Sequence, residues 1–123
     1  MILDGKKKIY KVRGRVFHCG IDVTMGFIGG KWKCVVLWYL RKENRRFSEL
    51  NRLIPDITEK MLSLQLKALE SDGLISRKVY GKKPPLKVEY ALTEFGRSLL
   101  PVIKRINSWG KELGEEEGGP FNV

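Results

Sequence analysis

Residues 47–93 carry the feature that most restricts the fold of this chain: two short amphipathic helices followed by two β-rich runs. The first helix is predicted from Phe47, Leu50 and Ile54, whose spacing of three and four residues places them on one helical face. The Pro55–Asp56 pair then ends this helix, because proline cannot donate the backbone hydrogen bond that a helix interior needs. The order predicts a helix, a turn and a second helix.

The second helix is predicted to run from an N-terminal cap at Thr58 to Gly73. The Thr58 hydroxyl can accept a hydrogen bond from a backbone N–H one turn later, which stabilises a helix start. One apolar stripe consists of Leu62, Leu66 and Leu69, and the other side carries Lys60, Ser63, Leu64 and Lys67. In a DNA major groove Leu64 would contact a thymine methyl group, with Lys60 and Ser63 reaching base edges or phosphates. The alternative is that Leu64 packs on a neighbouring loop while the lysines are merely solvated.

A basic β-hairpin is predicted after the second helix. Its strands are Ile75–Tyr80 and Val88–Thr93, and the loop 81–87 between them contains the glycine and prolines that turns need. The hairpin is crowded with positive charge at Arg77, Lys78, Lys82, Lys83 and Lys87. Such a loop suits a phosphate backbone or minor groove, where it positions a protein and says little about sequence. The whole order predicts a winged helix-turn-helix in an α+β, mainly α, chain.

The chain is strongly basic, with a formal net charge of +10. Glu115–Glu117 account for three of its 14 acidic residues, so the sequence before them is more basic still. Arg45, Arg46 and Ser48, at the start of the first helix, are placed to meet phosphate. The charge favours a polyanionic partner, which is nucleic acid, an acidic protein surface or anionic lipid.

Other classes of protein are poorly supported. The apolar run Cys34–Leu40 is far shorter than the ~20 residues of a membrane helix, and the lysine-rich N-terminus lacks the apolar segment of a secretory signal. We therefore expect a cytoplasmic protein with reduced cysteines and no membrane partner. His18 is the only histidine, and no carboxylate pair or glycine-rich phosphate loop is recognisable. We expect neither an enzyme nor a site for a metal or another cofactor.

The chain divides into a basic N-terminal arm (1–18), a single core domain (19–113) and a flexible acidic tail (114–123). Apolar and basic residues alternate from Tyr10 to Val16, which is typical of a half-buried or edge strand, although Gly14 weakens such a strand. The arm can pair with the rest of the domain, cover a dimer partner or touch phosphates, and the sequence does not choose. The tail is rich in glycine and glutamate and is expected to be mobile.

Two further helices are expected ahead of the helix-turn-helix. The first spans Asp22–Phe27, and the Gly29–Gly30 pair that follows suits a break. The second spans Trp32–Leu40 and is apolar on nearly every side, as a central helix is. The residues interpreted as core are Trp32, Val36 and Tyr39. The alternative for this aromatic cluster is a small effector pocket at a dimer interface.

A last helix is predicted to begin at Glu94, with Thr93 as its cap. Apolar residues run along it at a spacing of three and four: Leu99, Ile103, Ile106, Trp109 and Leu113. This is more apolar surface than a small core is expected to hide, so the stripe predicts a homodimer. A two-fold dimer would place equivalent helices about 34 Å apart, in successive major grooves. The alternative is that this helix folds back and completes the monomer.

Several short strings occur in a characteristic order and spacing. They are Cys19, Gly29–Trp32, Arg46–Leu50, Ile54–Pro55, Ile57–Leu62, Leu69–Glu70, Asp72–Ile75, Pro84–Pro85, Val88–Tyr90, Leu92–Thr93 and Gly96. On these strings, which cover roughly residues 19 to 110, the chain resembles HxlR-type transcriptional regulators, a winged helix-turn-helix group related to MarR regulators. The resemblance is highly specific because of the combination, since each string alone is weak.

The resemblance implies a dimeric regulator that binds double-stranded DNA at a near-palindromic operator, more often as a repressor than as an activator. Each protomer would place the helix from Thr58 in the major groove and the wing alongside. The effector of such a regulator, a small molecule or a redox signal, is not specified by the sequence. Three features depart from the family pattern. Gly20 replaces the usual proline after Cys19, Leu86 is an additional wing residue, and the arm is longer than the family's leader.

Cys19 is the candidate redox residue. It lies just before the helix expected at Asp22, whose positive end favours a reactive thiolate. The resemblance implies one hypothesis, a disulfide between the two Cys19 residues of a dimer, because some HxlR-type regulators use the corresponding cysteine as a redox sensor. The other interpretation is a structural, part-buried Cys19. Cys34 lies inside the apolar helix and is expected to be buried and inert.

A second class of function fits the same fold. A winged-helix interaction module would bind protein or nucleic acid without operator specificity. The two classes differ in a measurable property: specific duplex binding survives excess random DNA, whereas binding by a generic basic module is lost and shows only a steep salt dependence.

Overall fold

The computed structural model describes residues 2–3, 6–7 and 9–118. Within these, the helices are α1 (Gly20–Ile28), α2 (Trp32–Tyr39), α3 (Phe47–Leu53), α4 (Glu59–Ser71), α5 (Glu94–Ser98) and α6 (Leu100–Glu116). The strands form antiparallel pairs: β1 (Ile2–Leu3) with β2 (Lys6–Lys7), β3 (Tyr10–Val12) with β4 (Arg15–Phe17), and β5 (Ile75–Tyr80) with β6 (Lys87–Leu92). This confirms an α+β, mainly α, chain. Among the described helices, none is long and apolar enough to cross a membrane.

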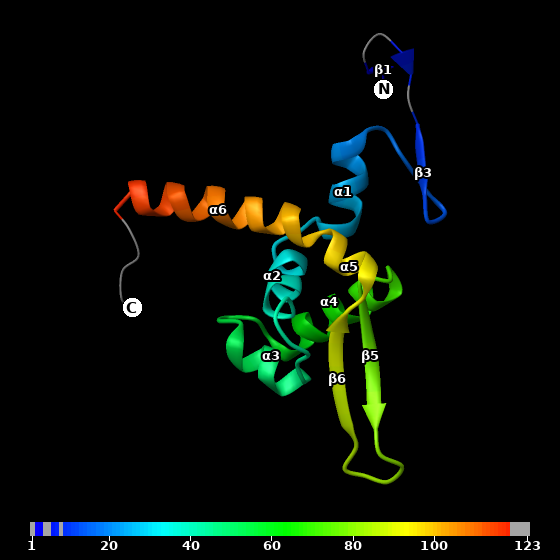
Figure 1. Ribbon diagram of the computed structural model, residues 1–123, viewed down its shortest axis with the longest axis vertical. Helices are drawn as coiled ribbons and strands as arrows, with labels where there is room; N and C mark the ends of the chain where they lie inside the picture. Colours follow the sequence, from blue (N-terminus) through cyan, green and yellow to red (C-terminus); the bar gives the residue numbers. More distant parts are fainter. Residues whose placement is uncertain (1, 4–5, 8, 119–123) are drawn as a thin grey trace.

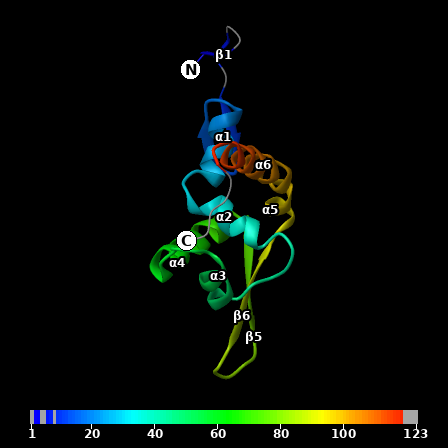
Figure 2. The same ribbon diagram turned by 90° about the vertical axis from the view of Figure 1, so that its left-hand side faces the viewer.

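The elements separate toward two ends of the long axis (Figures 1 and 2). α3, α4 and the β5–β6 hairpin lie at one end, with the hairpin projecting beyond the helices. The N-terminal strands lie at the other end, near α1. α2 lies between the two ends, and α6 extends sideways from the body (Figure 1). The predicted helix-turn-helix and hairpin therefore share one end of the molecule.

The core is built around α2, which packs against α3, α4 and α6. Val36 and Leu37 of α2 are completely buried. The apolar stripe of α4 closes on them, and its members are all at most 2% exposed: Leu62, Leu66 and Leu69. Trp32 and Tyr39 pack against this core and are partly buried, in agreement with their interpretation as core residues. Burial of the leucine stripe fixes the rotation of α4 and turns its polar side outward.

The helix-turn-helix is confirmed nearly residue by residue. α3 ends with Ile54 as its C-cap, immediately before Pro55. The Thr58 hydroxyl accepts a hydrogen bond of 3.0 Å from the Met61 N–H at the start of α4. After the C-cap of α4, Gly73 adopts a φ of +77°, a left-handed conformation that favours glycine.

The β-hairpin and the first two helices also follow the prediction, with shifted ends. β5 has the predicted bounds, while β6 begins one residue earlier than predicted, at Lys87, and ends at Leu92. Thr93 lies outside the strand because its hydroxyl accepts the Gly96 N–H at 3.0 Å and caps α5. α1 begins at Gly20, two residues before the predicted start.

The single C-terminal helix predicted from Glu94 is wrong, because the structure has two helices there. Pro101 lies in the first turn of α6 and has no N–H for the carbonyl oxygen four residues earlier, so α5 cannot continue into it. α6 then runs to Glu116, past the predicted domain boundary at Leu113. The first residues of the predicted mobile tail are therefore helical, and residues 119–123 lie outside the described residues.

The arm is a hairpin where the sequence predicted one strand. β3 and β4 pair in the register Tyr10 with Phe17, and the chain turns at Arg13 and Gly14, which have φ values of +48° and +80°. The alternating pattern continued through the turn, so the sequence did not reveal it. Phe17 is buried in the core, 7% exposed.

Two arginines attach this hairpin to the domain. The Arg13 guanidinium lies 3.8 Å from the centre of the Phe95 ring of α5, a cation–π contact. Arg15 lies 4.4 Å from the Phe27 ring centre and 3.7 Å from the Asp72 carboxylate at the end of α4. Of the three roles open to the arm, residues 10–17 thus take the first, which is pairing with the rest of the domain.

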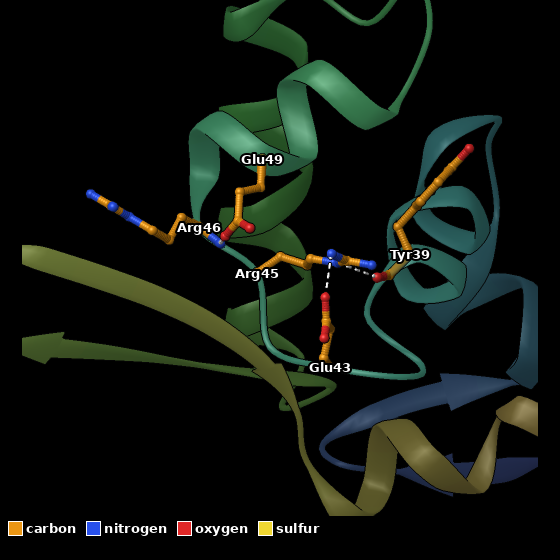
Figure 3. A network of polar contacts seen from close by, with 5 residues as sticks. All are labelled: Tyr39, Glu43, Arg45, Arg46 and Glu49. Atoms are coloured by element: carbon orange, nitrogen blue, oxygen red, sulfur yellow. Dashed lines mark hydrogen bonds and ion pairs between the residues drawn. The ribbon is translucent and has the colours of Figure 1, made fainter.

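Arg45 connects the helix-turn-helix to the hairpin (Figure 3). Its N–H donates to the Tyr90 carbonyl at 3.0 Å, and its carbonyl accepts the Tyr90 N–H at 2.7 Å. Its guanidinium donates to the Tyr39 carbonyl at 3.3 Å and to the Glu43 carboxylate at 2.6 Å. These bonds turn the side chain inward, so the prediction that Arg45 meets phosphate is corrected: Arg45 is a structural residue. Arg46 points the other way and is exposed (Figure 3).

We expect Gly96→Ala to lower the free energy of unfolding by roughly 2 to 3 kcal/mol, because the packed site must move to admit one methyl group. The added Cβ would overlap the Leu74 carbonyl oxygen. Urea denaturation measures the change. Gly20→Ala is the matched control, because a Cβ there meets nothing within 4 Å. Equal effects of the two substitutions would contradict the close contact between α5 and Leu74.

We expect Arg45→Ala to destabilise the fold by about 1 to 2 kcal/mol, because the Tyr39 carbonyl and Glu43 lose a charged donor. Arg46→Ala should change stability little, because its N–H, which donates to Glu49 at 2.8 Å, is retained. Thermal unfolding of the two variants side by side is the measurement. If Arg46→Ala is the more destabilising, the roles given to the two arginines are reversed.

Candidate nucleic-acid interface

The outward side of α4 carries the residues predicted for it. Thr58, Lys60 and Lys67 are exposed, and Ser63 is half-buried. Leu64 is 51% exposed, which contradicts the expectation that it packs on a neighbouring loop. The same helix thus has a completely apolar inner stripe and an outer side with one exposed leucine between two lysines.

A polar hollow of about 420 Å³ separates α4 from the hairpin. Ser63 and Lys67 line it from α4, and Arg77 and Tyr90 line it from β5 and β6. Arg77 and Tyr90 are directly opposite in the strand register, so their side chains lie on the same face of the hairpin. The structure therefore brings Arg77 together with two of the predicted α4 residues. Tyr90 was not predicted as a site residue, and only the strand pairing reveals it.

A second polar hollow, of about 520 Å³, lies between α3 and the hairpin. Arg46, Ser48 and Lys87, all predicted, line it together with Arg52. The prediction missed Arg52, although its position four residues after Ser48 on α3 indicates the same helical face. Glu49 and Glu89 also lie at this hollow, which makes its charge mixed.

The remaining basic residues of the hairpin are all exposed. Lys82 and Lys83 lie in the loop at its tip. The ammonium groups of Lys78 and Lys87 lie 5.1 and 5.6 Å from the centre of the Tyr80 ring, and Lys87 is also 3.5 Å from the Glu89 carboxylate. The hairpin therefore presents positive charge from its base to its tip, as predicted, with Lys87 partly neutralised.

The apolar stripe of α6 is divided between the core and the surface. Ile103 is only 3% exposed and completes the core of its own chain, and Leu99 is half-buried, so these two predicted dimer residues are not part of the exposed surface of α6. The exposed members are Val102, Ile106, Trp109 and Leu113, with exposed fractions of 41, 46, 69 and 42%. Val102 was not predicted, although it lies four residues before Ile106. The monomer is thus completed by the start of α6, and the rest of the helix presents an apolar surface.

The two cysteines occupy different surroundings. Cys19 is the N-cap residue of α1 and is half-buried. Cys34 is half-buried as well, where full burial was predicted, and its burial raises the pKa of the thiol above the usual range. Its Sγ lies 3.9 Å from the Ile28 carbonyl oxygen. Across the described part of the chain, His, Cys, Asp and Glu side chains nowhere gather in a group that could hold a metal ion.

The relatives found by sequence are transcriptional regulators of the helix-turn-helix type. A family model described as HxlR-like helix-turn-helix matches residues 27–118. The HTH-type transcriptional regulator YkvN of Bacillus subtilis (strain 168) is 50% identical over 101 residues, which cover 82% of this chain and 85% of YkvN. YdeP of the same organism, also an HTH-type transcriptional regulator, is 51% identical over 94 residues, 76% of this chain and 73% of YdeP.

Solved structures agree with the sequence relatives. The redox regulator HypR in its reduced form matches with a TM-score of 0.73 and 43% identity, covering 79% of this chain and 94% of HypR. The reduced form of the transcriptional regulator YodB from B. subtilis matches with a TM-score of 0.66 and 32% identity, covering 76% and 93% of the two chains. These relatives are transcription regulators, a non-enzymatic class, and their helix-turn-helix fold implies DNA binding. Family model, sequence relatives and fold agree that the chain belongs to the HxlR-like helix-turn-helix family of transcriptional regulators.

Proposed function

We propose that the protein is a homodimeric repressor that recognises a near-palindromic operator. The observation that carries this proposal is the outer side of α4, where Leu64 is 51% exposed between Lys60 and Lys67 while the opposite stripe is buried. In a major groove an exposed leucine can make an apolar contact with the methyl group of thymine. α4 is then the recognition helix, and the β5–β6 hairpin is the wing.

The recognition helix and the wing have different tasks in this proposal. Lys60, Ser63 and Leu64 reach base edges, because they lie in the first turns of α4, the part of a recognition helix that enters the groove. The phosphate contacts come from Thr58, Lys67, Arg46, Ser48, Arg52, Arg77, Lys78, Lys82, Lys83 and Lys87. Phosphate contacts position the protein, whereas base contacts select the sequence. The polar hollow between α4 and the hairpin carries members of both groups, and the hollow between α3 and the hairpin carries phosphate-contacting residues.

The dimer rests on α6. The exposed stripe of α6, formed by Val102, Ile106, Trp109 and Leu113, repeats at a spacing of four, three and four residues, which is the spacing of helix pairs that pack along their length. Beyond its first turns α6 extends from the body, with no other described element alongside it (Figure 1). A two-fold axis would give operator half-sites spaced by about one turn of duplex.

The signal is proposed to be redox, with Cys19 as the sensor. HypR, one of the structural relatives, is described as a redox regulator in both reduced and oxidised forms. Two Cys19 thiols, one from each protomer, would form a disulfide, and two electrons and two protons would pass to the oxidant. The competing interpretation is that Cys19 is a structural, half-buried residue and that a small-molecule effector acts elsewhere.

The test of the function is binding to a DNA site selected from a random pool, in the presence of excess random duplex. We expect Lys60→Ala, Ser63→Ala or Leu64→Ala to change the preferred sequence, by ~1–3 kcal/mol at the base pair touched. Lys82→Ala and Lys83→Ala should weaken binding to all sequences alike and make the salt dependence shallower. Fluorescence anisotropy over a series of operator variants and salt concentrations measures both effects.

Lys104→Ala is the control for this series, because Lys104 is an exposed lysine of α6 and belongs to neither α4 nor the wing. It should change neither preference nor affinity. If no selected duplex outcompetes random DNA, the protein is a generic interaction module and the proposal of a specific repressor is abandoned.

Oxidation tests the sensor. After treatment with a mild thiol oxidant, the wild-type protein should migrate as a covalent dimer on a non-reducing gel and lose affinity for its operator, because the new bond alters the spacing of the two recognition helices. Cys19→Ser should abolish both effects, and Cys34→Ser should preserve them. A wild-type protein that stays monomeric on the gel would show that no disulfide joins the protomers.

A further inference from the structure

We infer that, in the dimer, Trp109 of each protomer fills a cavity between α2 and α6 of the other. This inference rests on the homodimer of the proposed function and adds a specific contact to it. The partner is a second copy of this chain, and the contact is a knob of one copy in a hole of the other.

The hole is a cavity of about 310 Å³. Its lining from α2 includes Cys34, Trp38 and Tyr39, and its lining from α6 includes Ile103, Ile106 and Asn107. Most of this lining is apolar, and Ile106 at its edge is 46% exposed. This cavity is open to solvent, so covering its apolar lining with an apolar side chain from a partner removes that surface from water, which is favourable.

The knob is the indole of Trp109. This side chain is 69% exposed on α6. Burying an aromatic side chain removes about 150–250 Å² of surface from water, so aromatic residues contribute strongly to the free energy of an interface. Trp109 lies on α6 one turn after Ile106, within the helix that forms one wall of the cavity. α6 therefore forms one wall of an open cavity and also carries an exposed tryptophan.

An antiparallel pairing of two α6 helices centred near Ile106 would place the knob opposite the hole. If two α6 helices cross antiparallel with the two-fold axis near Ile106, a residue three positions after Ile106 on one helix faces the residue three positions before it on the other. Trp109 of one copy then faces Ile103 of the second copy, which lines the hole. Two-fold symmetry makes the contact twice, once in each direction.

The extent of the exposed apolar surface favours a second copy of the chain, and not a small ligand, as the occupant of the cavity. The exposed stripe continues beyond the cavity in both directions, to Val102 and to Leu113. A small molecule in the cavity would leave Trp109 and Leu113 in water, whereas a second α6 covers the whole stripe. The experiment separates a second copy from a small molecule and from another part of the same chain.

Reactivity of Cys34 reports whether the cavity is filled. In Cys19→Ser protein, Cys34 is the single thiol, and its alkylation by a small neutral maleimide is followed at mildly alkaline pH, because burial raises the pKa of this thiol. Sedimentation at each protein concentration gives the fraction of dimer. We expect alkylation to slow by about tenfold or more as the dimer forms, since a thiol without solvent access does not react.

Two truncations of the same stripe separate the knob from dimerisation in general. In the Cys19→Ser background, Trp109→Ala is compared with Leu113→Ala, each at a concentration where sedimentation shows a dimer. Both side chains are exposed in one protomer, so both variants should fold, and thermal unfolding verifies this. We expect Cys34 to regain the rate of the monomer only in Trp109→Ala.

Each other outcome contradicts the inference and shows which part of it is wrong. If Cys34 reacts as fast in the Cys19→Ser dimer as in the monomer, the dimer stands but the Trp109 contact is refuted. Protection of Cys34 that persists in Trp109→Ala dimers, or at concentrations where the protein is monomeric, shows that something other than the partner's Trp109 fills the cavity. A protein that never dimerises refutes the dimer of the proposed function itself.

Discussion

Burial of the leucine stripe of α4 against α2 is the interaction on which the rest of the structure depends. Leu62, Leu66 and Leu69 close on Val36 and Leu37, and all five side chains are at most 2% exposed. The side chains of a helix project at fixed angles around its axis, so burying this stripe also determines which residues of α4 point outward. The exposure of Leu64 and its neighbouring lysines is the necessary consequence of that burial, and the candidate interface follows from the core.

Several polar contacts then hold other elements in fixed positions around α4. Arg45 joins the loop before α3 to β6 through its backbone and to the end of α2 through its guanidinium. Arg15 joins the N-terminal hairpin to α1 and to Asp72 at the end of α4. These arginines look from the sequence like the other basic residues, yet they stabilise the domain. Positive charge in this chain therefore has two uses, and only the residues that point away from the body are available to a polyanion.

The apolar surface is divided in the same way along α6. Ile103 completes the core of one chain, whereas Ile106 and Trp109, one and two turns later, have no such partner. A helix that starts inside the core and extends beyond it both completes the core and presents an apolar surface. The cavity between α2 and α6 lies where these two parts of the helix meet, and Cys34 on its lining offers a probe of what fills it.

The sequence by itself determined the local elements of this protein: the helix-turn-helix, its cap at Thr58 and the basic hairpin all depend on residues close together in the chain. Apolar residues spaced by three and four positions, a proline that ends a helix and a glycine in a turn are all local sequence signals. These signals predict the elements without knowledge of the tertiary structure. The tertiary structure decided what local rules cannot: the inward turn of Arg45, the burial of Ile103, the folding of the arm against α1 and α5, and the presence of Tyr90 and Arg52 at the interface. Each of these depends on a partner distant in sequence, because a side chain's direction is set by whichever element packs beside it.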